Sequence, residues 1–148
     1  MIARRRANLL KMIIAIGIDM VEIARLAEVF ARRGERFRDR VFTASEIAYC
    51  ESRAGRMESY AARFAAKEAA MKALGTGWGE GVGWRDIEVL RLPTGLPSLQ
   101  FHGRALERLT ALGADRAHLS LTHSRDLALA HVVLEGKKKK RRGDAATR

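Results

Sequence analysis

The fold is decided by the stretch Arg63-Phe64-Ala65-Ala66-Lys67-Glu68-Ala69-Ala70-Met71-Lys72-Ala73-Leu74-Gly75-Thr76-Gly77. Its spacing of apolar residues predicts a long helix that ends at Gly75, the residue type that commonly follows a helix. One stripe of this helix carries Tyr60, Phe64, Glu68, Met71 and Leu74. A carboxylate therefore points toward the interior, where an ionised group without a partner is strongly disfavoured. Glu68 must either bind a proton or lie beside a cation.

The sequence offers Glu68 two kinds of cation. Lys72 lies one helical turn further on, and a helix ion pair is the commoner explanation for Glu followed by Lys at this spacing. The alternative is a metal ion that Glu68 shares with a second carboxylate. Asp19 supplies such a carboxylate from a distant part of the chain.

Asp19 follows a short run of apolar and β-branched residues that extends from Met12 to Ile18. Such a run predicts a strand covered on both faces, with Asp19 where the chain leaves the sheet. A helix is expected from Glu22 onward, so Asp19 fits equally well as the residue that caps that helix. Together, Asp19 and Glu68 would form the sparse oxygen set that suits Mg²⁺ when phosphates and waters complete its coordination.

Three separated motifs carry a resemblance to a known family. They are Gly17-Ile18-Asp19-Met20-Val21-Glu22-Ile23, the stretch from Arg63 to Gly77, and Ser120-Leu121-Thr122-His123-Ser124. In this order and spacing they resemble the holo-acyl-carrier-protein synthases. The resemblance implies a phosphopantetheinyl transferase, which moves 4′-phosphopantetheine from coenzyme A onto a serine of acyl carrier protein and releases adenosine 3′,5′-bisphosphate.

By resemblance, Asp19 and Glu68 are the Mg²⁺ ligands, and Glu68, or a water that it orients, takes the proton from the attacking serine. Lys72 then steadies the phosphates. Lys67 and Arg63 resemble family positions that contact the phosphates of coenzyme A, although a solvated basic helix face explains Arg63 equally well. The chemistry suits these residues, because breaking a diphosphate needs a cation and fixed positive groups more than a protein nucleophile.

His123 and the glycine-rich segment Gly75–Gly83 complete the set of candidates. Alternating residues around 118–123 and 127–134 predict a hairpin with His123 at the end of its first strand. A lone histidine there is usually a plain surface residue, but the third motif places His123 at the phosphate. By resemblance Gly75 and Thr76 lie against the pantetheine and diphosphate, whereas a simple helix stop needs only Gly75. The segment lacks the ending of a P-loop.

The formal net charge of +11 is concentrated at the two ends of the chain. Residues 1–11 carry +4 and residues 136–148 carry +6, so residues 12–135 carry only +1. A nucleic-acid-binding module, which the total charge favours, is opposed by this nearly neutral middle. Arginines still crowd the first expected helix, and by resemblance Arg25 belongs to the face that receives the acidic acyl carrier protein.

Length and composition predict one domain, residues 12–135, between two basic extensions. Residues 1–11 and 136–148 are expected to be disordered, and Met12 is an alternative start. No segment approaches the length of a membrane-spanning helix. The single cysteine, Cys50, excludes an internal disulfide and agrees with a cytoplasmic protein, so we expect it to serve only in packing.

The order of the expected elements predicts an α+β fold, with an antiparallel sheet packed against helices that include one long helix. The turn Thr94–Pro97 joins two middle strands, and a helix over residues 104–112 ends at Gly113. In the resembling family a lysine usually precedes the proline of this turn, and Leu96 departs from that pattern. The resemblance also implies a homotrimer with sites shared between subunits.

One further enzyme class fits the same residues. A metal-dependent phosphohydrolase would use the two carboxylates with water as its nucleophile in place of a carrier-protein serine. The two enzyme classes differ in whether a carrier protein gains mass.

Overall fold

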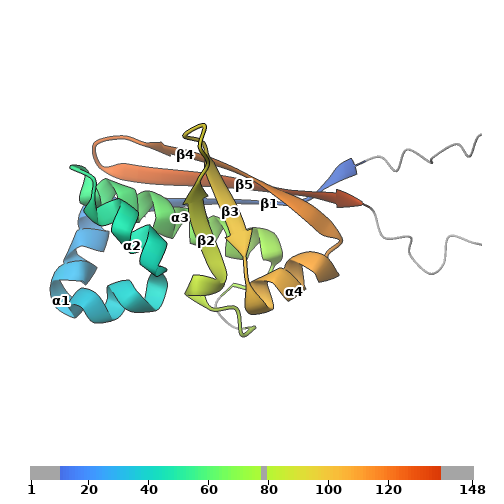
Figure 1. Cartoon of the computed structure of the whole chain (residues 1–148), viewed down its shortest axis with the longest axis horizontal. Coiled ribbons are helices and arrows are strands. Elements are labelled where there is room, and N and C mark those ends of the chain that lie inside the picture. The colour runs from blue at the N-terminus through green and yellow to red at the C-terminus, as the bar shows by residue number, and fades with distance from the viewer. Residues whose placement is uncertain (1–10, 78–79, 138–148) are drawn as a thin grey trace, which may run out of the picture.

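A computed structural model describes residues 11–77 and 80–137 of the chain (Figure 1). The elements are β1 (Lys11–Glu22), α1 (Ile23–Val41), α2 (Ala44–Glu51), α3 (Arg56–Leu74), the 3₁₀ turn η1 (Trp84–Asp86), β2 (Ile87–Arg91), β3 (Pro97–Phe101), α4 (Gly103–Ala111), β4 (Ala114–His123) and β5 (Leu127–Lys137). The predicted α+β fold class and its long helix, α3, are confirmed. The predictions for residues 1–10 and 138–148, and for Trp78 and Gly79 in the glycine-rich segment, lie outside the described residues.

The main sheet has the strand order β1-β5-β4, and both neighbouring pairs are antiparallel. The predicted hairpin is formed by β4 and β5, and His123 is the last residue of β4. The strands β2 and β3 form a separate two-stranded antiparallel hairpin. In Figure 1, α3 runs along the main sheet, while α1 and α2 gather at one end of the molecule and α4 lies toward the other.

Small residues let α3 approach β1 closely. The helix carries the buried alanines Ala65, Ala66, Ala69, Ala70 and Ala73. On the strand, Gly17 has no room for a side chain, because a Cβ atom there would lie 1.9 Å from the carbonyl oxygen of Ala69. This contact fixes α3 against β1, and therefore sets the position of Asp19 relative to α3.

The opposite side of β1 is uncovered in the single chain. Ile13, Ile16, Ile18 and Met20 expose 64%, 63%, 55% and 59% of their surface. The prediction of a strand covered on both faces is therefore wrong for one chain taken alone. A contiguous apolar surface of this kind usually marks an interaction site.

Local sequence signals fix the helix ends. Thr43 and Glu46 form both halves of a capping box at the start of α2. Gly75 follows α3 with a φ of 71°, a conformation that glycine adopts without steric cost. Cys50 is buried, as predicted. Among the helices of the described ranges, none has an apolar stretch long enough to traverse a bilayer.

Lys67 points into the interior of the molecule. Its side chain and that of Glu46 are both fully buried, and Nζ of Lys67 lies 2.9 Å from Oε2 of Glu46. Nζ also donates hydrogen bonds to the carbonyl oxygens of Trp84 and Ile87. The other oxygen of Glu46 accepts a hydrogen bond from the backbone N–H of Val89 at 2.7 Å. Burial lowers the pKa of Lys67, and the Glu46 carboxylate opposes that shift. This pair links α2, α3 and β2.

We expect Lys67→Met to lower the free energy of unfolding by about 3–5 kcal/mol, because it leaves the Glu46 carboxylate buried without its cation. Urea denaturation followed by circular dichroism, at one fixed protein concentration, measures the change. Arg56→Ala is the matched control, since it removes an exposed ion pair with Glu51 and should cost much less. Equal losses in the two variants would contradict the importance of the buried pair.

Candidate functional site

Asp19 lies within β1, opposite Ala130 of β5. It is neither at the strand end nor the cap of α1, because β1 continues to Glu22, which is itself the N-terminal cap residue. Nζ of Lys72 binds the Asp19 carboxylate, at 2.8 Å from Oδ1, and the carbonyl oxygen of Ile18 at 3.0 Å. The second oxygen, Oδ2, is buried and has no hydrogen-bond partner within the described ranges. The described residues therefore leave the acceptor capacity of this oxygen unused.

Glu68 projects from α3 next to Asp19 and is partly buried. Its pKa is raised from 4.5 to about 7, first by burial and then by the adjacent Asp19 carboxylate, while the positive charge of Lys72 acts in the opposite direction. The observed ion pair of Lys72 is with Asp19, so the simple helix pair between Glu68 and Lys72 is replaced by a bridge to β1. Two crowded carboxyl groups beside a single ammonium favour a further cation.

Glu68 lines a groove of about 590 Å³ between α1, β1 and α3. We call it the carboxylate groove, and its lining includes Arg25, Arg32, Arg33, Phe64 and Glu68. The exposed side chain of Arg25 therefore lines the same groove as Glu68. The structure therefore brings together two residues that the sequence assigned to different tasks.

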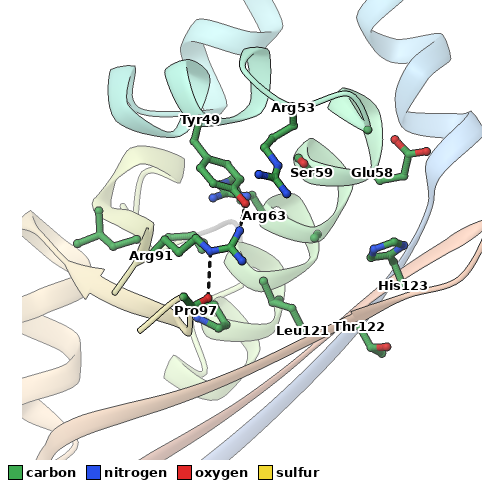
Figure 2. A pocket seen from close by; sticks show the side chains of 15 residues that line it. Tyr49, Arg53, Glu58, Ser59, Arg63, Arg91, Pro97, Leu121, Thr122 and His123 are labelled. Atoms are coloured by element: carbon green, nitrogen blue, oxygen red, sulfur yellow. Dashed lines mark hydrogen bonds between the residues drawn. The ribbon is translucent and has the colours of Figure 1, made fainter. Parts of the chain in front are cut away.

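Arg63 and His123 line a second cavity, of about 470 Å³ (Figure 2). We call it the arginine pocket, and define it by Tyr49, Arg53, Arg63, Arg91 and His123. Arg63 is only 6% exposed, so it does not belong to a solvated helix face. Its guanidinium lies 3.9 Å from the centre of the Tyr49 ring. Its Nε is buried and lacks a hydrogen-bond partner among the residues that the structure describes.

The structure places Lys67 and Thr76 outside both the carboxylate groove and the arginine pocket. Lys67 was expected to contact the phosphates of coenzyme A. In the structure its ammonium instead pairs with Glu46 and donates hydrogen bonds to two carbonyl oxygens in the interior. A fully buried ammonium with these partners has no free face for a phosphate. Thr76 lines a third cavity, together with Arg104 and Arg108, and its hydroxyl is buried without a partner in the described part of the chain.

The residues of the arginine pocket were only partly visible in the sequence. Tyr49 in the last turn of α2 and Arg53 just after the helix are four residues apart, a spacing that permits contact between an aromatic ring and a cation. Arg91 gave no signal, because it reaches Tyr49 only through the pairing of β2 and β3 and their position against α2.

Asp19 and Glu68 are the residues best suited to hold a metal ion. No group of three or more His, Cys, Asp or Glu side chains with metal-binding geometry occurs in residues 11–77 and 80–137. Two carboxylates with one unpartnered oxygen fit a hard divalent cation that takes its remaining ligands from water and phosphate. A soft or tetrahedral site would need thiolate or imidazole ligands that are lacking here.

Comparison with known proteins agrees with the motifs. The family model described as the 4′-phosphopantetheinyl transferase superfamily matches residues 15–131. A holo-acyl-carrier-protein synthase from Koribacter versatilis is 52% identical over 124 residues, which cover 84% of this chain and 99% of that protein. The crystal structure of the synthase from Neisseria meningitidis has a TM-score of 0.75 and 35% identity, covering 83% of this chain and 98% of the other. The Helicobacter pylori synthase in complex with coenzyme A has a TM-score of 0.71 and 32% identity, covering 80% and 98%.

Asp19→Asn is expected to lower the pKa of Glu68 from about 7 toward 4.5, because it removes the neighbouring negative charge. Burial is the larger cause, so the pKa should stay above 4.5. Carbon-13 NMR of the glutamate carboxyl groups in metal-free buffer measures it. Asp115→Asn, which alters a carboxylate beside Lys11, is the control and should leave the pKa unchanged.

The same shift has a consequence for stability. The folded state binds more protons than the unfolded state between pH 4.5 and about 7, so raising the pH through this window lowers the free energy of unfolding. Asp19→Asn should make that dependence shallower. An unchanged Glu68 titration in this variant would show that the two carboxyl groups do not interact.

Proposed function

The chain belongs to the 4′-phosphopantetheinyl transferase superfamily, and we propose that it acts as a holo-acyl-carrier-protein synthase. It transfers 4′-phosphopantetheine from coenzyme A to a serine of apo acyl carrier protein and releases adenosine 3′,5′-bisphosphate. The observation that carries the proposal is the meeting of Asp19, Glu68 and Lys72, which come from two distant motifs. The solved complex of the Helicobacter pylori relative with coenzyme A supports the choice of substrate.

We propose Mg²⁺ as the cofactor, held by Asp19 and Glu68. Support comes from the unpartnered Oδ2 of Asp19 and from the crowding that raises the pKa of Glu68. Lys72 already occupies Oδ1 of Asp19, which leaves Oδ2 for the metal. When bound, the ion would neutralise negative charge that develops on the diphosphate.

In the transfer, the serine oxygen of the carrier protein forms a bond to the phosphorus attached to pantetheine, and the bond from that phosphorus to the bisphosphate leaving group breaks. Glu68 takes the proton of the serine hydroxyl, directly or through a water. Lys72 has three N–H donors and uses two of them on Asp19 and Ile18, so the third is available to a phosphate oxygen.

The arginine pocket is proposed to bind the phosphate-bearing nucleotide end of coenzyme A. Arg63 offers an unused buried donor, and the exposed imidazole of His123 lies at the mouth of the same cavity. Contacts of Gly75 and Thr76 to pantetheine and diphosphate stay a prediction. Lys67 supports the site from within and is not among the proposed substrate contacts.

Arg25 is proposed to receive the acyl carrier protein. An acidic partner placed against Arg25, Arg32 and Arg33 would bring its serine into the groove that contains Glu68. Complementary charge of this kind mainly raises the rate of encounter and weakens with salt. A cytoplasmic location is also proposed, in keeping with the single, buried and unpaired Cys50.

A homotrimer with shared sites would resolve two features of the single chain. The first is the exposed apolar side of β1, formed by Ile13, Ile16, Ile18 and Met20. The second is the separation of Arg63 from Glu68. Five residues of helix turn the two side chains about 140° apart, and they line different cavities. We propose that one subunit supplies the arginine pocket and its neighbour supplies the carboxylates to the same coenzyme A.

Apo acyl carrier protein incubated with coenzyme A, Mg²⁺ and this chain should gain the mass of one phosphopantetheine group, measured by intact-mass spectrometry. Asp19→Asn and Glu68→Gln should each slow the reaction by at least about 10²-fold, because a metal ligand is lost in each. Arg56→Ala serves as the control and should react like the wild type. Release of adenosine bisphosphate without any mass gain would point to a phosphohydrolase and refute the transferase.

Light scattering coupled to size-exclusion chromatography should give three times the chain mass of 16.5 kDa. Ile18→Asp should give the mass of one chain, because it places a charge in the proposed interface. Leu96→Asp is the matched control, since Leu96 is 61% exposed on the β2–β3 turn and the variant should keep the trimer mass.

Complementation between inactive variants tests whether one site is shared between two subunits. Arg63→Leu and Glu68→Gln should each be nearly inactive alone, but co-expressed chains should regain transfer, because some mixed interfaces join an intact Arg63 to an intact Glu68. Failure of the mixture to exceed the two single variants would contradict shared sites, whatever the mass of the assembly.

A further inference from the structure

Tyr49 occupies the centre of the arginine pocket. Three guanidinium groups surround its ring, at 3.9 Å from the centroid for Arg63 and 5.5 Å for both Arg53 and Arg91. Figure 2 shows these side chains converging from α2, the loop after it, α3 and β2. The electron-rich face of an aromatic ring attracts cations over this range of distance. One side chain therefore touches every arginine of the pocket.

The charge of the three arginines is not neutralised by any acid in the described part of the chain. Within the described ranges, none of them has a carboxylate at ion-pair distance, and Glu58, which also lines the pocket, is not paired with them. Like charges brought this close repel each other, more strongly where water is partly excluded. Tyr49 offsets some of this repulsion, and a polyanionic ligand would offset the rest.

Arg91 is held by two further contacts. Its Nε donates to the carbonyl oxygen of Gly95 at 3.0 Å, and its Nη1 donates to the hydroxyl oxygen of Tyr49. The hydroxyl thus orients Arg91, while the ring face attracts all three guanidinium groups and lies closest to that of Arg63. The two parts of the Tyr49 side chain have separate tasks that separate substitutions can test.

We propose that Tyr49 is a positioning residue that holds Arg53, Arg63 and Arg91 in place for the phosphate groups of the nucleotide end of coenzyme A. The inference rests on the proposed function, which supplies the ligand. The Nε of Arg63, whose guanidinium lies closest to the Tyr49 ring, is buried without a hydrogen-bond partner among the described residues. A phosphate oxygen bound there would satisfy it.

Calorimetric titration of the full-length assembly with adenosine 3′,5′-bisphosphate tests the proposal without requiring turnover. Tyr49→Leu keeps apolar volume but removes the ring face, and should raise the Kd about tenfold. Tyr49→Phe keeps the ring face and should raise it no more than about threefold. Arg56→Ala, an arginine outside the pocket, should leave it unchanged.

Steady-state kinetics separate positioning from a general loss of structure. Tyr49→Leu should raise KM for coenzyme A by a similar factor, with kcat and KM for acyl carrier protein within about twofold of wild type. A Kd for Tyr49→Leu equal to that of the wild type, or an equal loss in Tyr49→Phe, would overturn the role of the ring. Neither result would affect the transferase assignment, which fails only if the wild type adds no mass to the carrier protein.

A second comparison decides the matter if Tyr49→Leu does not fold. Arg91→Gln removes the guanidinium that the Tyr49 hydroxyl aims. If the hydroxyl acts through Arg91, the combined variant Tyr49→Phe with Arg91→Gln should bind the bisphosphate no more weakly than Arg91→Gln alone. Additive losses would overturn the proposal.

Discussion

The ammonium of Lys67 has no contact with water, and its surroundings replace the hydration that it has lost. Glu46 supplies the opposite charge, and the carbonyl oxygens of Trp84 and Ile87 take the remaining protons. Because these partners belong to α2, η1 and β2, one buried cation fixes the rotation of α3 against three other segments. Glu68 is the next residue, about 100° further around the helix. Anchoring Lys67 inward thus directs Glu68 toward β1 and Asp19.

Residues close in sequence were predicted well, and residues whose partners are distant were not. The helix end at Gly75 and the β4–β5 hairpin both depend on neighbours a few positions away. Lys67 was misplaced because its partner Glu46 lies 21 positions earlier in the chain, and no periodicity indicates which face of a nearly all-buried helix such a lysine takes.

The candidate site was likewise predicted only in part. Asp19 and Glu68 were paired from a resemblance and from the cost of burying a carboxylate, and their proximity is seen in the structure. That Asp19 sits inside β1 was missed, because an acidic residue after an apolar run favours a strand end or a cap. The uncovered side of β1 was missed for a different reason. A strand that faces another subunit has the same apolar composition as a strand buried within its own chain.

Charge pairing distinguishes the structural cations from the proposed functional ones. The buried Lys67 is matched by Glu46 and by backbone acceptors, as a charge that serves only stability must be. Arg63 is nearly as buried, yet it has an aromatic ring in place of a carboxylate and retains an unused donor. An interior guanidinium left in this state lowers stability unless a ligand completes it. The fold therefore accepts a loss of stability at Arg63, where a phosphate is proposed to bind. It has no such loss at Lys67, whose charge is fully paired and serves only stability.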